Sequence, residues 1–265
     1  MRFVKLSPAI HRKSSQLYFS FSPQRSGQHL VIDWLCRGLD DILHVNHARL
    51  RRRGLFRHIE PLAGRVVLYK GEIVTDTGRI ELGKLPPVGD MTFRKEFWSA
   101  EDICPLDPSY RDFGGSIPQK AIVILRDPAN WLASTFRMGR WAAKDFERKV
   151  GIYRQTLQFC LENRGNPQWS FICFNDFVSS PDFRKALSTE FADHDLSRAE
   201  RALDEVPDFG GGSSFSGLSD KVGTSVQERW HAYIDDPDFL RLLRTPDLRP
   251  LSKSFFGRDY LHFLD

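Results

Sequence analysis

Residues Leu17 to His29, LYFSFSPQRSGQH, decide the fold of this 265-residue chain. The first six residues form an aromatic run that Pro23 and Gly27 soon interrupt, which is typical of a buried strand ending at a functional loop. After the loop, apolar residues recur at helical spacing from Leu30 to Leu39. The order strand, loop, helix predicts an anion-binding turn, because backbone N–H groups and the positive end of the helix dipole meet there.

Three further apolar runs are typical of strands: Val66–Tyr69, Ala121–Leu125 and Ser170–Phe174. Their hydrophobicity is continuous rather than alternating, which favours parallel strands covered on both faces. Helical patterns lie between them, and the clearest runs from Phe146 to Cys160 and stops before Gly165. Strands that alternate with helices predict an α/β fold in which helices flank a central parallel sheet.

Composition limits the class of protein. Hydrophobic residues make up 41% of the chain and charged residues 27%, so a disordered or fibrous protein is excluded. The net charge of +4 is too small for a dedicated nucleic-acid binder but suits a groove for an anionic ligand. We find no apolar run of membrane-spanning length and no signal peptide. The four cysteines form no Cys-x-x-Cys pair, so we expect free thiols and a cytoplasmic protein.

Two segments interrupt the alternation of strands and helices. Residues from about 71 to 118 are rich in proline and weakly periodic, so we expect a variable, irregular region that forms the acceptor side of a site. Residues from about 210 to 230 begin with a Gly/Ser-rich run and predict a mobile lid. No internal repeat is found, and we expect a single domain over residues 1–265.

The loop itself contains Arg25, Ser26 and Gly27, followed by Gln28 and His29. Gly27 allows the backbone to approach a phosphate closely. The loop is not a Walker A motif, because a Lys followed by a magnesium-binding Ser or Thr is missing. An ordinary nucleotide-dependent kinase is therefore disfavoured, and a simple helix cap formed by the same residues is the structural alternative.

A second candidate motif follows the strand Ala121–Leu125. Arg126 stands at the carboxyl end of that strand, where open α/β sheets bind ligands. Ser134 lies eight residues later on the expected helix. Arg126 can bind a second phosphate through its guanidinium fork while Ser134 donates its hydroxyl. The alternative is an arginine neutralised by the adjacent Asp127.

With both motifs in view, the chain resembles the sulfotransferases that use 3′-phosphoadenosine 5′-phosphosulfate (PAPS), which have a P-loop-like fold. In that family a Pro-Lys/Arg-Ser-Gly-Thr loop holds the 5′-phosphosulfate, and an Arg with a Ser eight residues later holds the 3′-phosphate. Arg25-Ser26-Gly27 and the pair Arg126/Ser134 match those positions. Phe174-Asn175-Asp176-Phe177 looks like the family's Tyr-Glu-Asp-Leu segment. Residues 223–230 are similar to its C-terminal Gly-x-Trp segment.

The resemblance implies transfer of a sulfuryl group from PAPS to a hydroxyl or amine, with 3′-phosphoadenosine 5′-phosphate (PAP) as product and no metal. Arg25 would stabilise the leaving phosphate. The segment after Val66–Tyr69 resembles the strand end that carries the family's base, which assigns Glu72 as base and Lys70 as its neighbour; an exposed ion pair is the alternative. Lys221 of the lid would bind the 3′-phosphate, and Arg229 is a further basic residue there.

The chain also departs from the family pattern. Gln24 separates Pro23 from Arg25, and Gln28-His29 replace the usual hydroxyl pair, so phosphate contacts would come from the amide, the imidazole or backbone N–H groups. A non-catalytic PAPS- or PAP-binding module therefore remains an alternative. The acceptor is a small molecule, a glycan or a lipid, and the oligomeric state is not indicated. His44-x-x-His47 has helical spacing but no third ligand, so we interpret it as a solvated pair.

Overall fold

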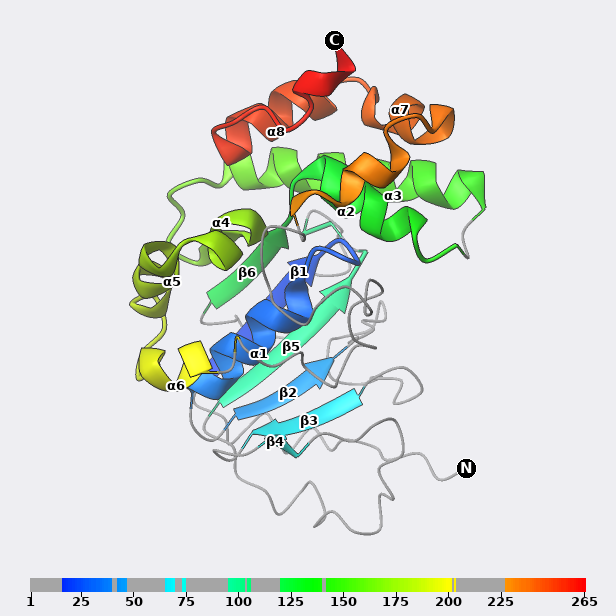
Figure 1. Cartoon of the computed structure of the whole chain (residues 1–265). Coiled ribbons are helices and arrows are strands. Elements are labelled where there is room, and N and C mark those ends of the chain that lie inside the picture. Colours follow the sequence, from blue (N-terminus) through cyan, green and yellow to red (C-terminus); the bar gives the residue numbers. More distant parts are fainter. Residues whose placement is uncertain are drawn as a thin grey trace, which may run out of the picture.

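The computed structural model describes residues 16–39, 42–46, 65–69, 73–74, 95–102, 104–105, 120–139, 142–201, 203 and 227–265. Within these residues a seven-stranded sheet has the order β4-β3-β2-β5-β1-β6-β7 (Figure 1). The strands are β1 (Gln16–Ser22), β2 (Ile42–Asn46), β3 (Arg65–Tyr69), β4 (Ile73–Val74), β5 (Lys95–Glu101), β6 (Lys120–Leu125) and β7 (Trp169–Cys173). β2, β5, β1, β6 and β7 are parallel neighbours, whereas β3 and β4 run antiparallel at one edge.

Helices cover both faces of this sheet and complete a three-layer α/β fold. They are α1 (Gln28–Gly38), α2 (Pro128–Phe136), α3 (Ala143–Glu162), α4 (Phe174–Ser179), α5 (Pro181–Ser188), α6 (Leu196–Arg201), α7 (Pro237–Leu243) and α8 (Leu248–Phe256), with the 3₁₀ helices η5 (Arg229–Tyr233) and η6 (His262–Leu264). One face carries α1, α4, α5 and α6, and the other carries α2, α3, α7 and α8 (Figure 1). The predicted α/β fold with a central parallel sheet is confirmed.

The side chains of β1 contribute to both hydrophobic cores, because successive residues of a strand point to opposite faces. Phe19 and Phe21 join the core beneath α2, α3, α7 and α8, whereas Tyr18 joins the core beneath α1 and α4 to α6. All three are almost completely buried. Burial of each such side chain contributes roughly 1.5–3 kcal/mol, so β1 is anchored firmly at the centre of the sheet.

The structure confirms the predicted β1, the helix that follows it and the long helix α3. Two other predictions need correction. The run Val66–Tyr69 lies in β3, which is antiparallel to β2. The run Ser170–Phe174 ends its strand at Cys173, because Phe174 already begins α4. An apolar run indicates burial on both faces but carries no information on strand direction.

The region 71–118 is not irregular throughout, because it contains β5. This strand lies between β1 and β2, close to the middle of the sheet. Its charged residues concealed it: the side chain of Lys95 is buried and lies 3.7 Å from Asp193. His44 also differs from the prediction of a solvated pair, because it is fully buried in β2 and lies 3.0 Å from the hydroxyl of Ser99.

Candidate anion-binding site

The loop between β1 and α1 has an unusual backbone. Arg25 has φ 74° and Gly27 has φ 83°, both in the left-handed region. A hydrogen bond of 3.1 Å from the Ser26 N–H to the Pro23 carbonyl closes the turn between them. A Cβ atom on Gly27 would lie 2.2 Å from the ring of Phe174, so no larger residue fits there. The sequence analysis assigned Gly27 to close backbone approach to a phosphate. The structure shows a different constraint, because the Phe174 ring occupies the space of a Cβ atom.

This loop presents donors to the space in front of α1. The first N–H groups of a helix have no partner inside the helix, and the helix dipole makes this end positive. The Ser26 hydroxyl is buried and has no hydrogen-bond partner among the described residues. A buried hydroxyl of this kind needs a partner, and an anion seated on the N-terminal turn of α1 would supply one.

The second predicted motif meets the first. β6 ends at Leu125, and α2 begins at Pro128, where the Asp127 carboxylate accepts a hydrogen bond of 2.9 Å from the Asn130 N–H. Arg126 lies between them, is only 2% exposed, and its guanidinium lies 5.5 Å from the centre of the Phe174 ring. Nearly two turns along α2, the hydroxyl of Ser134 lies 3.4 Å from Nε of Arg25. Arg25, Ser134 and Arg126 are therefore brought to the same end of the sheet.

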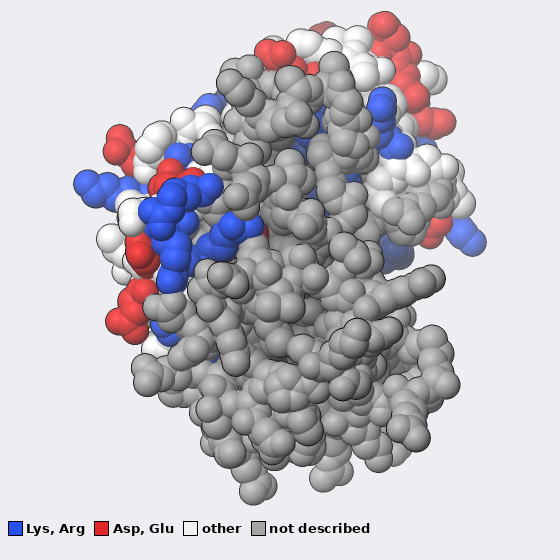
Figure 2. All heavy atoms as spheres, turned by 60° about the horizontal axis from the view of Figure 1, so that its bottom comes forward, with Lys and Arg blue, Asp and Glu red and all other residues white. Residues whose placement is uncertain are grey.

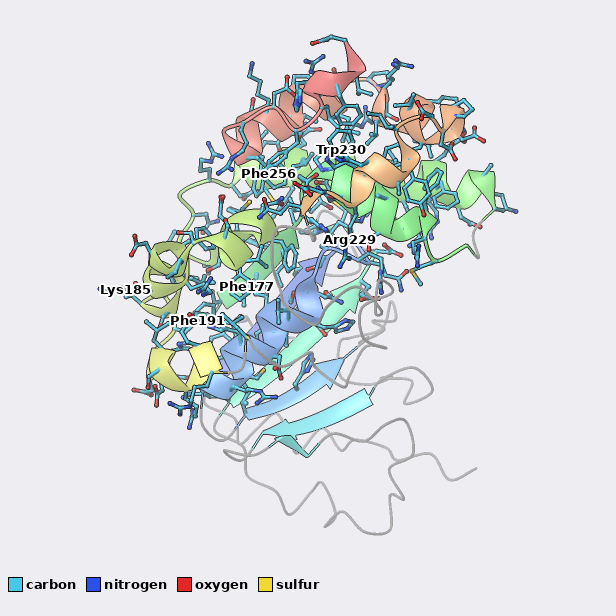
Figure 3. All side chains as sticks on the ribbon, in the orientation of Figure 1. Phe177, Lys185, Phe191, Arg229, Trp230 and Phe256 are labelled. Carbon is cyan, nitrogen blue, oxygen red and sulfur yellow. The ribbon has the colours of Figure 1, made fainter. Side chains whose placement is uncertain are left out.

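A third arginine joins them from the C-terminal part of the chain. Burial lowers the pKa of Arg126 to about 9; the neighbouring Asp127 acts in the opposite direction, while Arg229 and Arg25 lower it further. Burial also lowers the pKa of Arg229 to about 10, with Arg25 and Arg137 adding to the effect. Figure 3 shows Arg229 near the carboxyl end of β1. Like charges this close raise the energy of the free protein, and a bound anion would offset that energy.

The charge on the molecular surface is arranged differently. On the face shown in Figure 2, the described Lys and Arg side chains lie among Asp and Glu side chains. By contrast, the charges of Arg229 and Arg25 lower the pKa of Arg126, and the charge of Arg25 lowers the pKa of Arg229. The cluster of these three arginines thus has the electrostatic character of an anion site, which the modest net charge of the chain does not reveal.

Arg229 is held in place through Asn130. The side-chain N–H of Asn130 donates a hydrogen bond of 2.6 Å to the Gln227 carbonyl. The side-chain oxygen of Asn130 accepts a hydrogen bond of 3.3 Å from the Trp230 N–H. The Trp230 ring stacks on the Phe263 ring with ring centres 4.2 Å apart, so it packs against the core. These contacts join the start of η5 to α2, so Arg229 is part of the site although it lies more than 200 positions after Arg25 in the sequence.

The segment that resembles Tyr-Glu-Asp-Leu, residues 174–177, packs against the residues of the candidate site. Phe174 contacts Gly27 on one side and Arg126 on the other. The Asn175 side chain accepts a hydrogen bond of 2.9 Å from the Asp127 N–H and donates a hydrogen bond of 2.8 Å to the Asp127 carboxylate. Asp127 is therefore occupied by amide donors, which satisfies its buried charge and leaves it as the fixed cap of α2.

The predicted residues Gln28 and His29 face a carboxylate that the sequence interpretation missed. Gln28 is buried, and its side-chain amide donates to Glu101 at 2.5 Å. Nε2 of His29 lies 3.8 Å from the same carboxylate. Glu101 is the last residue of β5. An acidic residue at the end of a strand is the sequence feature that could have identified it as a site residue. That signal was hidden because β5 lay in a region expected to be irregular.

Three predicted residues, Lys70, Glu72 and Lys221, lie outside the described residues, and their roles stay predictions. The same holds for most of the expected lid. Among the described residues, β3 runs antiparallel to β2. Its last residue, Tyr69, pairs with Ile42 at the beginning of β2, and Ile42 pairs with the beginning of β5. Tyr69 therefore lies at the sheet edge where the parallel strands begin, whereas the anion-binding loop lies where they end.

Two searches of the described residues had negative results. In this part of the chain every helix is too short or too polar to span a bilayer. The same residues hold no group of three His, Cys, Asp or Glu side chains that could bind a metal ion.

Comparison with known protein-family models finds no match, and neither does comparison with curated proteins. Among solved structures, the chain is similar to the sulfotransferase domain of the olefin synthase of Synechococcus PCC 7002, with 14% identity over 98% of this chain and 99% of that one and a TM-score of 0.52. A mouse sulfotransferase in complex with PAP matches with 13% identity, 94% of each chain covered and a TM-score of 0.46. The chain has the P-loop-like α/β fold of the Synechococcus sulfotransferase domain.

Proposed function

We propose that this chain is a single-domain, cytoplasmic sulfotransferase that moves the sulfuryl group of PAPS to a hydroxyl or amine of a small-molecule, glycan or lipid acceptor. The observation that carries the proposal is the contact of Arg25 with Ser134 beside the buried Arg126. It joins two anion-binding motifs at one end of the sheet, as a ligand with two separate phosphates requires. A simple helix cap would not need a second arginine motif at the same place.

The residues present fit PAP and PAPS. The unpartnered Ser26 hydroxyl and the N-terminal turn of α1 suit the 5′-phosphate side. Gly27 is proposed for close backbone approach to the same phosphate. Arg126 and Ser134 suit the 3′-phosphate, with Arg229 able to share that charge. We also propose Lys221 as a lid residue for the same phosphate, following the family resemblance.

PAPS, when bound, would supply the sulfuryl group and a nucleotide phosphate as leaving group. The chain's own task is to orient the reactants and to stabilise the negative charge that develops on the leaving phosphate oxygen. We propose Arg25 for this purpose because its Nε donates a hydrogen bond of 3.4 Å to the Ser134 hydroxyl, beside the other anion-binding motif. No step of this kind requires a metal ion, since guanidinium groups and backbone dipoles can neutralise the leaving phosphate.

A base is needed to accept the proton of the acceptor, which is worth roughly 10² to 10⁴ in rate. Glu72 is the base proposed from the resemblance. Glu101 is a second candidate from the geometry, because its carboxylate lies beside the loop and is oriented by the Gln28 amide. Glu101→Gln retains an oxygen for Gln28 and should reduce kcat about 10²-fold or more with little change in PAP affinity. If Glu72→Gln has that effect instead, Glu101 is not the base.

The first test is a thermal-shift titration with PAP, with ADP plus magnesium as the comparison ligand. PAP at about 100 times its Kd should add about 2.7 kcal/mol, which corresponds to roughly 5–11 °C for a chain of this size. Arg126→Ala should abolish the shift. Arg241→Ala is the matched control, because Arg241 is exposed on α7 and pairs with Glu147 at 2.9 Å.

The outcomes separate the alternatives. A shift with PAP that ADP does not reproduce supports the proposal and justifies a screen of hydroxylated acceptors for formation of PAP. An equal or larger shift with ADP and magnesium would favour a kinase. Selective PAP binding without turnover of PAPS on any acceptor would favour the non-catalytic binding module.

A further inference from the structure

Gln24, one of the residues that depart from the family pattern, makes three hydrogen bonds to residues outside the loop. Its N–H donates 2.9 Å to the Asp102 carboxylate. Its carbonyl accepts 2.9 Å from the indole N–H of Trp131. Its side-chain oxygen accepts 3.3 Å from the ammonium group of Lys149. Side chains from α2, from α3 and from the residue after β5 thus meet at the residue that directly precedes Arg25.

Two of these partners form an ion pair with each other. Lys149 projects from α3, its side chain is 1% exposed, and its ammonium group donates to the Asp102 carboxylate. Asp102 follows β5, has φ 56°, and its N–H donates 3.0 Å to the Ser22 carbonyl at the end of β1. The pair therefore connects α3, β5 and β1 at the point where the loop leaves the sheet.

A buried ion pair of this kind is weak support for stability by itself, because desolvation of the two charges offsets their attraction. Its placement points to another role. Arg25 is a non-glycine residue in the left-handed region, which is disfavoured by about a tenfold population ratio in the absence of restraints. Both groups of the pair bind Gln24, the residue immediately before that strained position.

We propose that the Asp102–Lys149 pair is a positioning device that clamps Gln24, keeps Arg25 in its left-handed conformation and so aims the guanidinium at the anion site. The inference rests on the proposed function for its effect on PAP, but the clamp itself does not depend on any ligand. Loss of the clamp should let Arg25 relax. If the competent conformation falls to about a tenth of the population, PAP affinity should fall about tenfold.

The first experiment measures amide hydrogen exchange in the free protein. Lys149→Met should accelerate exchange across the β1–α1 loop. The matched control is Arg184→Met, because Arg184 is also buried and paired, with two hydrogen bonds of 2.7 and 2.8 Å to Glu200, but this pair joins α5 to α6. The control should leave the loop unchanged. Equal exchange of the loop in Lys149→Met and the wild type would overturn the clamp.

The second experiment measures PAP affinity by calorimetry in Lys149→Met, Arg25→Ala and the double variant. If Lys149 acts through Arg25, its loss should weaken PAP about tenfold in the wild type, or 1.4 kcal/mol, but add little in the Arg25→Ala background. A merely structural role predicts the same loss in both backgrounds, and that result would overturn the proposal. Arg184→Met should bind PAP like the wild type.

Two further arms keep the proposal testable. If Lys149→Met does not fold, Asp102→Asn/Lys149→Met removes both charges together and should show faster loop exchange and weaker PAP binding than Arg184→Met. Lys149→Arg keeps the charge and should restore part of the affinity. If the wild type fails to bind PAP, the proposed function fails, whereas the exchange experiment still decides whether the pair holds the loop.

Discussion

Gly27 offers the sharpest test of the site's geometry. Replacing it with alanine imposes φ 83° on a residue with a Cβ atom, which costs about 1–2 kcal/mol. The new Cβ would also lie 2.2 Å from the Phe174 ring, whereas ordinary contacts begin at 3.4 Å. Phe174 is 4% exposed and packed in the core, so its displacement adds about 1–3 kcal/mol.

Gly165→Ala is the matched control. Gly165 has φ 90°, after the end of α3, and a Cβ atom there would meet nothing within 4 Å. Gly165→Ala therefore has the energetic cost of a left-handed backbone but no steric clash of the new Cβ atom. We expect Gly165→Ala to lower Tm by about 2–8 °C and Gly27→Ala to lower it by about 2–12 °C more, at 2–4 °C per kcal/mol. Differential scanning calorimetry measures both.

The same substitution should weaken PAP binding, because the displaced Phe174 ring is the surface on which Arg126 lies. We expect a loss of at least about tenfold in Gly27→Ala and none in Gly165→Ala. Gly27→Ala/Phe174→Leu, which gives the Cβ room, should regain part of the lost Tm but not the affinity. If Gly27→Ala melts no lower than Gly165→Ala, the contact between the loop and α4 is wrong, and with it the reasoning on the site.

Two further predictions test the electrostatics. Arg229→Gln relieves repulsion from Arg25 and Arg126, so it should raise the Tm of the free protein by about 1–2 °C while lowering PAP affinity; a lower Tm would contradict the clustering of these charges. Burial lowers the pKa of His194 from 6.5 to about 4, so the unfolded chain binds its proton first as the pH falls. The protein should therefore lose up to about 3 kcal/mol between pH 6.5 and 4, and urea titrations should show a smaller loss in His194→Gln.

The parts of the fold that sequence reasoning predicted are those encoded locally. β1, its loop and α1 follow one another, and the change from an aromatic run to helical spacing is visible within about 20 residues. The places of Arg126 after a strand and of Ser134 on the following helix were also predicted, because a strand end and the helix after it are local features. Their contact with Arg25 spans more than 100 positions and depends on β1 and β6 being neighbours, which hydrophobic patterns do not specify.

The residues that were missed share a different property. β5 has charged residues at both ends, Lys95 and Glu101, and their tertiary partners on other elements make them acceptable in the middle of the sheet. Local sequence patterns do not predict such partners. Arg229 was named in the sequence analysis as a basic residue of the lid, but its position also depends on a long-range contact, because Asn130 holds the start of η5 against α2. Whether a charged residue can be buried depends on a partner far away in the sequence, so hydrophobic periodicity does not predict it.

The two anion-binding motifs are also held at a fixed spacing, and this argues for the kind of ligand. Trp131 donates 2.9 Å to the Gln24 carbonyl, and the Tyr153 hydroxyl donates to the Arg126 carbonyl. The two rings stack on each other with centres 4.3 Å apart and are fully buried. The backbones beside Arg25 and Arg126 are thus fastened to one rigid aromatic pair. If the proposed function holds, a preorganised site of this kind should favour a ligand whose two anionic groups stand on opposite sides of a ribose, as in PAP, over ADP, whose phosphates form a single chain.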